Sequence, residues 1–383
     1  MTFTLALALA ALLVNIVVGI DLIRGNRMIR SLQAVEPVLP AHIPRVSVIV
    51  PARNEERNIG AALAAMQQLD YPDLELILVN DRSDDATASI MDAIAKDDPR
   101  MQVVHVTELP AGWLGKNNAL WLGAARASGE LLLFTDADIV MAPSLIRRAV
   151  AYLVSEKVDH LVVTPRMEMP GRLLPMFGLT FMLVFAMFTR PWKARDPKSR
   201  AHIGIGAFNL VRAESYRACG GHEAIRLRPD DDLKLGKLIK KNGFAQDIVA
   251  GPDFMSVEWY STVGEVVRGL EKNTFAGVDY RLWMAAGGVI VLFLLLLWPF
   301  LALLFTVGAT RYLNLLIVAI IVLLLINCAD ANKLSRWYVI GFPLALALFI
   351  WILIRTTTLN LVQGGITWRG TFYRLAELKG NRI

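Results

Sequence analysis

Five long stretches of the chain are apolar and contain no charged side chain, and they limit the possible folds more than any other feature. They cover residues 2–20, 173–189, 284–307, 313–328 and 338–354. A helix needs about 20 consecutive, mostly apolar residues to cross the hydrocarbon core of a bilayer. Hydrophobic residues make up 55% of the chain, which is more than a water-soluble protein usually contains. The sequence therefore predicts an integral membrane protein.

The first stretch predicts a transmembrane anchor over residues 1–23. Three arginines follow it, whereas a cleaved secretory signal carries its cations before the apolar run, so we expect the anchor to stay uncleaved. Because basic residues favour the cytoplasmic side, the N-terminus is expected outside and the following domain inside, at the cell (inner) membrane. Residues 24–44 are basic and then proline-rich, which predicts a juxtamembrane segment and linker.

The last three apolar stretches predict transmembrane helices within residues 283–356, and residues 357–383 form a basic tail. If all three helices cross, the tail lies outside, against the preference of basic residues, unless one segment is re-entrant. The stretch over residues 173–189 is short for a span, and a crossing there would strand the next segment outside. We therefore expect an in-plane interfacial helix, with a buried core helix as the alternative.

Residues 45–282 alternate short β-branched runs with alanine-rich stretches, which predicts an α/β domain with a largely parallel sheet covered by helices. Strands are expected at residues 46–50, 74–79, 103–106 and 131–134, and helices at 56–69, 85–95 and 117–127. Forty basic residues against 34 acidic ones give a dispersed net charge of +6, too mild for a nucleic-acid partner. Cys219 lies in a polar stretch and Cys328 in an apolar one, which excludes a disulfide scaffold and favours a cytosolic domain.

Three groups of polar residues in this domain are candidates for chemistry. The segments Pro51 to Glu56 and Asn80 to Asp85 follow strands, at the sheet edge where α/β proteins bind ligands, although turns and helix caps use the same residue types. Asp136 and Asp138 follow the fourth strand and favour Mg²⁺ or Mn²⁺, with a helix start as the alternative. The run Asp230 to Asp232 either caps a helix or supplies a base.

Six short motifs, over roughly residues 45–280, resemble in kind and in order those of family-2 glycosyltransferases with the GT-A fold. They are Pro51-Ala52-Arg53-Asn54-Glu55, Asn80-Asp81-Arg82-Ser83-Asp84-Asp85, Gly115-Lys116, Asp136-Ala137-Asp138, Gly220-Gly221-His222 and Asp231-Asp232. The anchor, the C-terminal apolar segments and Trp113-Leu114-Gly115-Lys116 are similar to the branch that contains ceramide glucosyltransferases and hopanoid-associated or carotenoid glycosyltransferases. The resemblance implies a GT-A, Rossmann-like domain with one N-terminal and about three C-terminal transmembrane helices.

The same resemblance implies roles for individual residues. Asp232 would be the catalytic base, Asp138 would hold the metal, and Asp81 would contact the uracil of a UDP-sugar. The donor site would consist of Pro51, Arg53, Glu55, Asp81, Lys116 and Asp136. The acceptor and diphosphate region would consist of Gly220, Gly221, His222, Asp231, Lys272 and Asn273.

The implied function is an inverting, metal-dependent transfer of a sugar from a nucleotide-sugar to a hydroxyl of a membrane lipid at the cytosolic membrane face. A processive polysaccharide synthase is one alternative, but residues 268–273 replace the Gln-x-x-Arg-Trp motif of such enzymes. A non-catalytic membrane scaffold that binds nucleotides is the other alternative. The expected partners are the nucleotide-sugar, the lipid and the bilayer.

Overall fold

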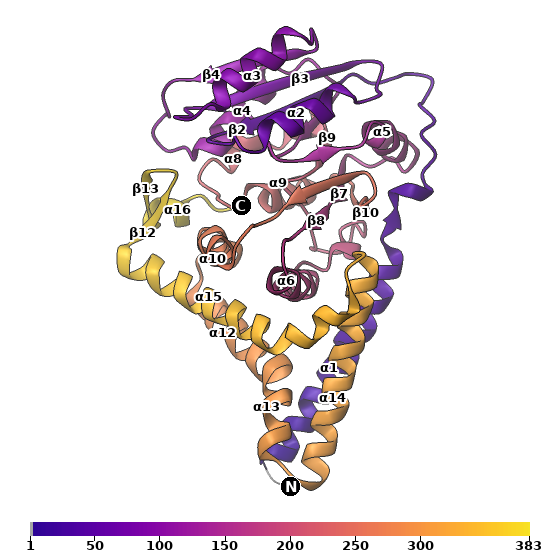
Figure 1. Ribbon diagram of the computed structural model, residues 1–383, viewed down its shortest axis with the longest axis vertical. Helices are drawn as coiled ribbons and strands as arrows, with labels where there is room; N and C mark the ends of the chain where they lie inside the picture. The colour runs from indigo at the N-terminus through magenta and orange to yellow at the C-terminus, as the bar shows by residue number, and fades with distance from the viewer. Residues whose placement is uncertain (1–2) are drawn as a thin grey trace. The chain divides into compact units, whose positions relative to one another are not determined.

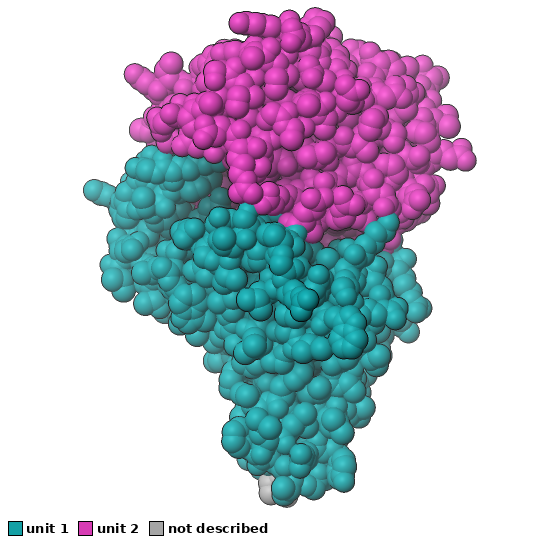
Figure 2. Space-filling view, viewed as in Figure 1, with its two compact units in different colours: residues 1–28, 169–190, 259–379 teal, residues 29–168, 191–258, 380–383 magenta. Residues whose placement is uncertain are grey.

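The computed structural model describes residues 3–383, which divide into two compact units, drawn in different colours in Figure 2. The helical unit contains the described chain up to Met28, Met169–Arg190 and Trp259–Lys379. The sheet unit contains Ile29–Glu168, Pro191–Glu258 and Gly380–Ile383. The first two residues of the predicted anchor lie outside the described part of the chain.

The sheet unit is built on one eight-stranded sheet. Its strands are β1 (Arg30–Ser31), β2 (Val46–Ala52), β3 (Leu74–Asp81), β4 (Met101–Val106), β5 (Leu131–Phe134), β7 (His160–Thr164), β9 (Asn209–Arg212) and β10 (Gln246–Ala250). Their order is β1-β10-β7-β9-β5-β2-β3-β4. All neighbours are parallel except β9, which runs antiparallel to β5 and β7. A second sheet joins β6 (Val140–Met141), β11 (Met255–Glu258) and β8 (Arg166–Glu168).

Helices cover both faces of the large sheet and enclose two hydrophobic cores (Figure 1). Val48 and Val50 of β2 face one core, whereas Ile49 between them faces the other, as the two-residue repeat of a strand requires. Burial on both faces explains the continuous β-branched run that predicts this strand. The first core is covered by α2 (Ile59–Gln67), α3 (Thr87–Lys96) and α5 (Leu145–Ser155). The second is covered by α4 (Gly115–Arg126), α7 (Ala213–Ala218), α8 (Gly221–Ala224) and α9 (Asp231–Lys241).

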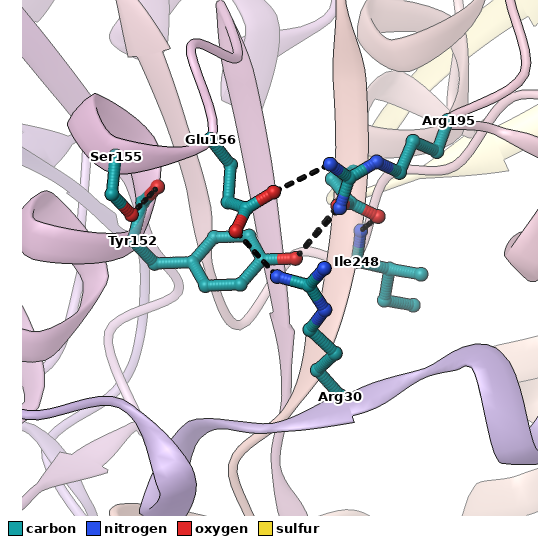
Figure 3. Close-up of polar contacts among 7 residues, drawn as sticks. Arg30, Tyr152, Ser155, Glu156, Arg195 and Ile248 are labelled. Carbon is teal, nitrogen blue, oxygen red and sulfur yellow. Dashed lines mark hydrogen bonds and ion pairs between the residues drawn. The ribbon is translucent and has the colours of Figure 1, made fainter.

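The sheet unit begins before the predicted boundary at residue 45. β1 pairs with β10 at the sheet edge, and Leu32 in the short 3-10 turn η1 (Leu32–Ala34) is fully buried. Figure 3 shows how charges hold this edge: the Glu156 carboxylate accepts hydrogen bonds from both Arg30 and Arg195. The start of the predicted linker is therefore part of the folded unit, because its apolar and basic residues find partners there.

The helical unit contains α1 (Phe3–Met28), α6 (Leu173–Thr189), α10 (Val263–Glu271), α11 (Thr274–Gly277), α12 (Leu282–Leu292), a π-helical turn η3 (Phe293–Leu297), α13 (Trp298–Phe305), α14 (Gly308–Ala331), a 3-10 helix η4 (Arg336–Gly341) and α15 (Phe342–Gln363). The predicted tail folds into a hairpin of β12 (Gly365–Trp368) and β13 (Thr371–Arg374), followed by α16 (Leu375–Gly380). Within residues 3–383, five helical segments are long and apolar enough to cross a membrane: Phe3–Met28, Leu173–Lys193, Leu282–Phe305, Gly308–Ala331 and Arg336–Gln363.

A proline explains the irregular turn between α12 and α13. Pro299 has no N–H, so the carbonyl oxygen of Leu295, four residues earlier, loses its usual helical donor. The side-chain amide of Asn15 in α1 donates to this oxygen at 3.1 Å. The buried Asn15 therefore compensates for the proline, as a polar group at this depth must be satisfied.

The four predicted strands are confirmed as β2 to β5, and the helix expected at residues 173–189 is α6. The helix expected from residue 56 begins at Ile59, after a turn in which the backbone N–H of Glu56 donates to Asp85. The short strands β7, β9 and β10 were not predicted. They have five, four and five residues.

Candidate active site

Two loops at the carboxyl edge of the sheet are bonded to each other. The backbone N–H of Asn54, after β2, donates to Ser83 at 3.1 Å, and the N–H of Asp84 donates back to the Asn54 side chain at 2.9 Å. Glu55 donates its N–H to Thr87, the first residue of α3, at 2.7 Å. The polar residues after β2 and β3 thus form one surface. The turns and helix caps that were the alternative explanation of these residues are present, and they position the neighbouring side chains.

Asp81, the last residue of β3, is fully buried below this surface. Arg82 donates its Nε hydrogen to one Asp81 oxygen at 2.8 Å. Gly115 opens α4 so close to Asp81 that an added Cβ would overlap the other oxygen. Gly115 therefore lets the N-terminus of α4 approach the carboxylate that the sequence assigns to the nucleobase.

A glycine also joins the two acidic motifs. The Asp136 N–H donates to the Gly206 carbonyl at 3.1 Å, and the Gly206 N–H donates to Asp232 Oδ2 at 2.8 Å. An added Cβ on Gly206 would overlap the Asp136 carboxylate. Asp136 follows β5 and Asp232 lies in the first turn of α9, so residues about a hundred positions apart meet at one backbone unit.

Lys116 is the cation at the centre of this acidic group. Its Nζ lies 2.8 Å from Asp136 Oδ1 and 3.3 Å from Asp231 Oδ2, and only 16% of its side chain is exposed. Burial alone would lower the pKa of Lys116, but the charges of Asp136 and Asp231 raise it above its usual value. Lys116 is therefore charged and holds the two acidic motifs together.

The three consecutive aspartates have different partners. Asp230 pairs with Arg228, with Nε to Oδ1 at 3.1 Å, and with Lys234 one turn later at 3.3 Å. Asp231 contacts Lys116. Asp232 instead accepts the backbone N–H groups of Gly206 and Leu233. The role of Lys234 could have been inferred from its i, i+4 spacing, but nothing in the sequence points to Arg228.

The environment of Asp232 suits a base. Burial, together with the negative charge of Asp231, raises the pKa of Asp232 to about 7. A general base is most effective when its pKa lies near the working pH. Asp230 and Asp231 are instead held in ion pairs, with Arg228 and Lys234 and with Lys116.

Asp138 lies close to the carboxylates of Asp136 and Glu55, with which it could share a metal ion. Burial and the charges of Asp136 and Glu55 raise the pKa of Asp138 to about 7. Within residues 3–383, no group of three His, Cys, Asp or Glu side chains is arranged as a metal site. Mg²⁺ commonly takes one or two carboxylates and completes its shell with substrate phosphates and water. These acids therefore fit an ion that binds together with a diphosphate.

His222 and the glycines before it are explained in part by packing. His222 is buried, and its Nδ1 lies 2.9 Å from the hydroxyl of Tyr216, which the sequence analysis did not single out. Gly220 and Gly221 have φ of +84° and +51°, and an added Cβ on Gly221 would overlap the Tyr216 ring. Burial and the charge of Lys116 lower the pKa of His222 to about 3, so the imidazole is neutral.

The remaining predicted site residues lie in both units. Pro51 is the last residue but one of β2, which is buried over its whole length. Arg53 follows the strand with a buried Nη1 that has no hydrogen-bond partner among the described residues. Lys272 and Asn273 belong to the helical unit, where the Lys272 ammonium lies 4.7 Å from the ring centre of Trp368. The structure thus brings together the acids, Lys116 and His222, while Lys272 and Asn273 are described only within their own unit.

The grouped residues line a small pocket of about 10 Å³, enough for one water molecule. Its walls are Lys116, Leu120, Phe134, Thr135, Asp136, Gly206, Asn209, His222, Asp231, Asp232 and Leu235. Lys116 and both of its ion-pair partners, Asp136 and Asp231, belong to this lining.

Comparisons with known proteins agree with this fold. A mannosyltransferase from Pyrobaculum calidifontis, solved in complex with GDP-Man and Mn²⁺, superposes with a TM-score of 0.57 over 94% of this chain and 99% of its own, at 20% identity. The sheet unit therefore has a GT-A-type fold.

Residues 47–220, somewhat under half of the chain, match the family model for glycosyl transferase family 2. The 4,4'-diaponeurosporenoate glycosyltransferases of Staphylococcus aureus strains MRSA252 and USA300 are 26% identical over 220 residues, which cover 56% of this chain and 56% of each relative. The match thus spans little more than half the length of these relatives. Residues 47–220 are therefore similar to glycosyl transferase family 2.

Proposed function

We propose that this protein transfers a sugar from a nucleotide-sugar to a hydroxyl group of a membrane lipid, with inversion at the anomeric carbon. The observation that carries the proposal is the convergence of Asp136, Asp231 and Asp232 around one buried ammonium group at the carboxyl edge of the sheet. Asp81, buried beneath the neighbouring loops, supplies an acceptor for a nucleobase, and we take the donor to be a UDP-sugar.

In the proposed reaction, Asp232 removes the proton from the acceptor hydroxyl. The oxygen then attacks the anomeric carbon and forms the new glycosidic bond, while the bond from that carbon to the diphosphate breaks. The bonding electrons leave with the nucleoside diphosphate, and the proton remains on Asp232. Its raised pKa supports this role, because a carboxylate with a pKa of about 7 accepts a proton more readily than an ordinary one.

Lys116 has two roles in this scheme. Without a donor it neutralises Asp136 and Asp231, and with a donor its ammonium pairs with the departing diphosphate, which stabilises the leaving group. Asp138, with Asp136, would hold Mg²⁺ or Mn²⁺, and the ion would neutralise further charge on the diphosphate. Arg53 offers a buried N–H for the donor at the same edge.

The lipid acceptor is supported by the apolar helices that flank the domain and by the name of the curated relative, which is a glycosyltransferase of 4,4'-diaponeurosporenoate. We place the catalytic domain on the cytoplasmic side of the cell membrane, because basic residues follow the first apolar helix. A water-soluble donor and a membrane-bound acceptor then meet at the membrane surface.

The proposal is tested by comparing lipid extracts of cells with and without the protein by mass spectrometry. We expect one lipid class to gain the mass of a sugar residue, and a strain that carries Asp232→Asn to lack that product. A sugar polymer without a lipid product would favour a polysaccharide synthase. Nucleotide binding without any new product would favour a non-catalytic scaffold.

A further inference from the structure

We infer that three of the five apolar helical segments cross the membrane, namely α1, the continuous segment α12–α13 and α14, whereas α6 and α15 lie in the plane of the bilayer surface. The partner of these two helices is the boundary between lipid headgroups and acyl chains, on the same side as the sheet unit. The inference depends on chain connectivity and on contacts within each unit, and it does not depend on the proposed reaction.

The first step is the direction of α14. The side-chain amide of Asn26 in α1 donates to Asn327 of α14 at 3.1 Å. Seven residues earlier, Gly19 faces Leu324 and Ile320, with an added Cβ 3.4 Å from Leu324. Positions along both helices increase together, so α1 and α14 pack side by side in the same direction, as Figure 1 also shows.

The second step compares the ends of these two helices. α1 ends at Met28, and the next residue, Ile29, belongs to the sheet unit. Because α14 runs parallel to α1, its C-terminal end at Ala331 reaches the same side of the membrane. The segment α12–α13 joins α14 through the two residues 306–307 and therefore crosses in the opposite direction.

The third step is the return of the chain. Residues Gly380–Ile383 belong to the sheet unit, where Asn381 accepts the Leu227 N–H at 3.0 Å and donates to the Ala224 carbonyl at 2.9 Å. Ile383 packs against the core that α4 and α9 cover. The chain is thus on the sheet-unit side both after α14 and at residue 380.

Between these points, η4–α15 is the one described segment long and apolar enough to cross. A single crossing would leave the chain on the wrong side, so α15 does not cross. The same reasoning applies to α6, because the chain leaves the sheet unit at Glu168 and returns to it at Pro191. Two crossings, not three, are thereby assigned to the C-terminal helices.

The packing of α15 is consistent with this placement. α15 packs along α6, where Phe349 lies 6.3 Å from the ring centre of Phe181, and it contacts α10, where Arg355 pairs with Glu271. The apolar windows of α6 and α15 are each 44% buried within the protein, against 22% for α1 and for α12–α13 and 39% for α14, which α1 and α13 cover. α6 and α10 thus cover part of the α15 surface, and the rest of that surface is left to contact lipid.

The charge distribution provides an independent argument. From Leu282 to Ala329 the chain contains one charged side chain, Arg311. With three crossings, the basic residues of the tail, including Arg369 and Arg374, share a side with the arginines that follow α1. The conflict with the positive-inside preference that arises from three C-terminal spans disappears.

Cysteine labelling with a membrane-impermeant maleimide tests the side of each end of α15. The native Cys219 and Cys328 are buried and give little background. We place single cysteines at three exposed positions, Ser335 before α15, Gln363 at its end and Val307 in the turn between α13 and α14, with Glu108 in the sheet unit as the reference.

We expect Ser335→Cys and Gln363→Cys to label from the same side as Glu108→Cys, and Val307→Cys to label from the opposite side. Labelling of Gln363→Cys together with Val307→Cys would overturn the inference, because α15 would then cross. Labelling of Val307→Cys together with Glu108→Cys would also overturn it, because α12–α13 and α14 would then fail to cross.

Spin-label depth gives a second readout. Leu344 near the start of α15 and Ile354 near its middle are 80% and 48% exposed and lie about 15 Å apart along the axis, so a crossing helix would place Ile354 much deeper than Leu344. We expect labels at both positions to show the same shallow depth in lipid vesicles. Labels at Val291 and Leu304, about 20 Å apart on α12–α13, should differ in depth. A depth difference on α15 as large as that on the control helix would contradict the in-plane placement.

Discussion

Asp232→Asn is the most informative substitution at the proposed site. The asparagine keeps the size of the side chain and an oxygen that can accept the Gly206 N–H, so the loop between the two acidic motifs should keep its position. What the variant loses is the ability to take a proton. The substitution therefore separates base catalysis from the architecture of the site.

The expected magnitude follows from this role. A positioned general base contributes roughly 10²- to 10⁴-fold to a rate, so kcat should fall by that factor while the Kd of the nucleotide-sugar changes little. In the native protein, kcat/KM should rise with pH through about 7, because the raised pKa of Asp232 leaves much of it protonated and inactive below that pH. The variant should lose this dependence.

The assay is product formation in lipid vesicles over pH 5.5 to 8.5, with calorimetry for donor binding. Asp230→Asn is the matched control, because it removes a charge from the same acidic run but from a residue paired with Arg228 and Lys234. The control should lower thermal stability and retain the pH profile. If Asp232→Asn keeps more than a tenth of native kcat, or keeps the native pH profile, Asp232 is not the base.

Three further substitutions test the site and the fold. Asp138→Ala should make donor binding by calorimetry insensitive to Mg²⁺ or Mn²⁺, and an unchanged metal dependence would exclude Asp138 as a ligand. Gly115→Ala should push Asp81 from its position and weaken donor binding at least tenfold, whereas Gly60→Ala, where the added Cβ meets only Ile90 at an ordinary 4.0 Å, should not. Burial lowers the pKa of His160 from 6.5 to about 4, so the unfolded chain binds this proton first and stability falls by about 3 kcal/mol between pH 7 and 4. His160→Gln should reduce that loss in denaturation measurements, and an equal acid sensitivity of both proteins would contradict the assignment.

The central strands and the order of the acidic motifs could be predicted because each depends on local sequence. Buried parallel strands read as continuous apolar runs, and β2, β3 and β5 end where the polar loops begin. That Asp136 and Asp232 should meet followed only from the family resemblance. The contact itself depends on the loop around Gly206, whose path no local pattern encodes.

Other features could not be predicted from local sequence because they depend on contacts between distant segments. The pairing of Lys116 with Asp231 joins α4 to α9, and β1 is recognisable only beside β10. The sequence of α15 is as apolar as that of a membrane-spanning helix, so composition alone predicts a crossing. The contact of α15 with α6 and the return of the chain to the sheet unit at Gly380 distinguish it from such a helix.

The fate of the sugar tests the central claim most directly. Purified protein in lipid vesicles is incubated with UDP-sugars and GDP-sugars labelled with ¹³C at the anomeric carbon, and the lipid and aqueous phases are analysed by NMR. We predict that one donor transfers its label to a lipid hydroxyl with inverted anomeric configuration, and that one nucleoside diphosphate is released per sugar transferred. Retention of configuration, a water-soluble polymer, or hydrolysis of the donor without a labelled lipid would contradict the account.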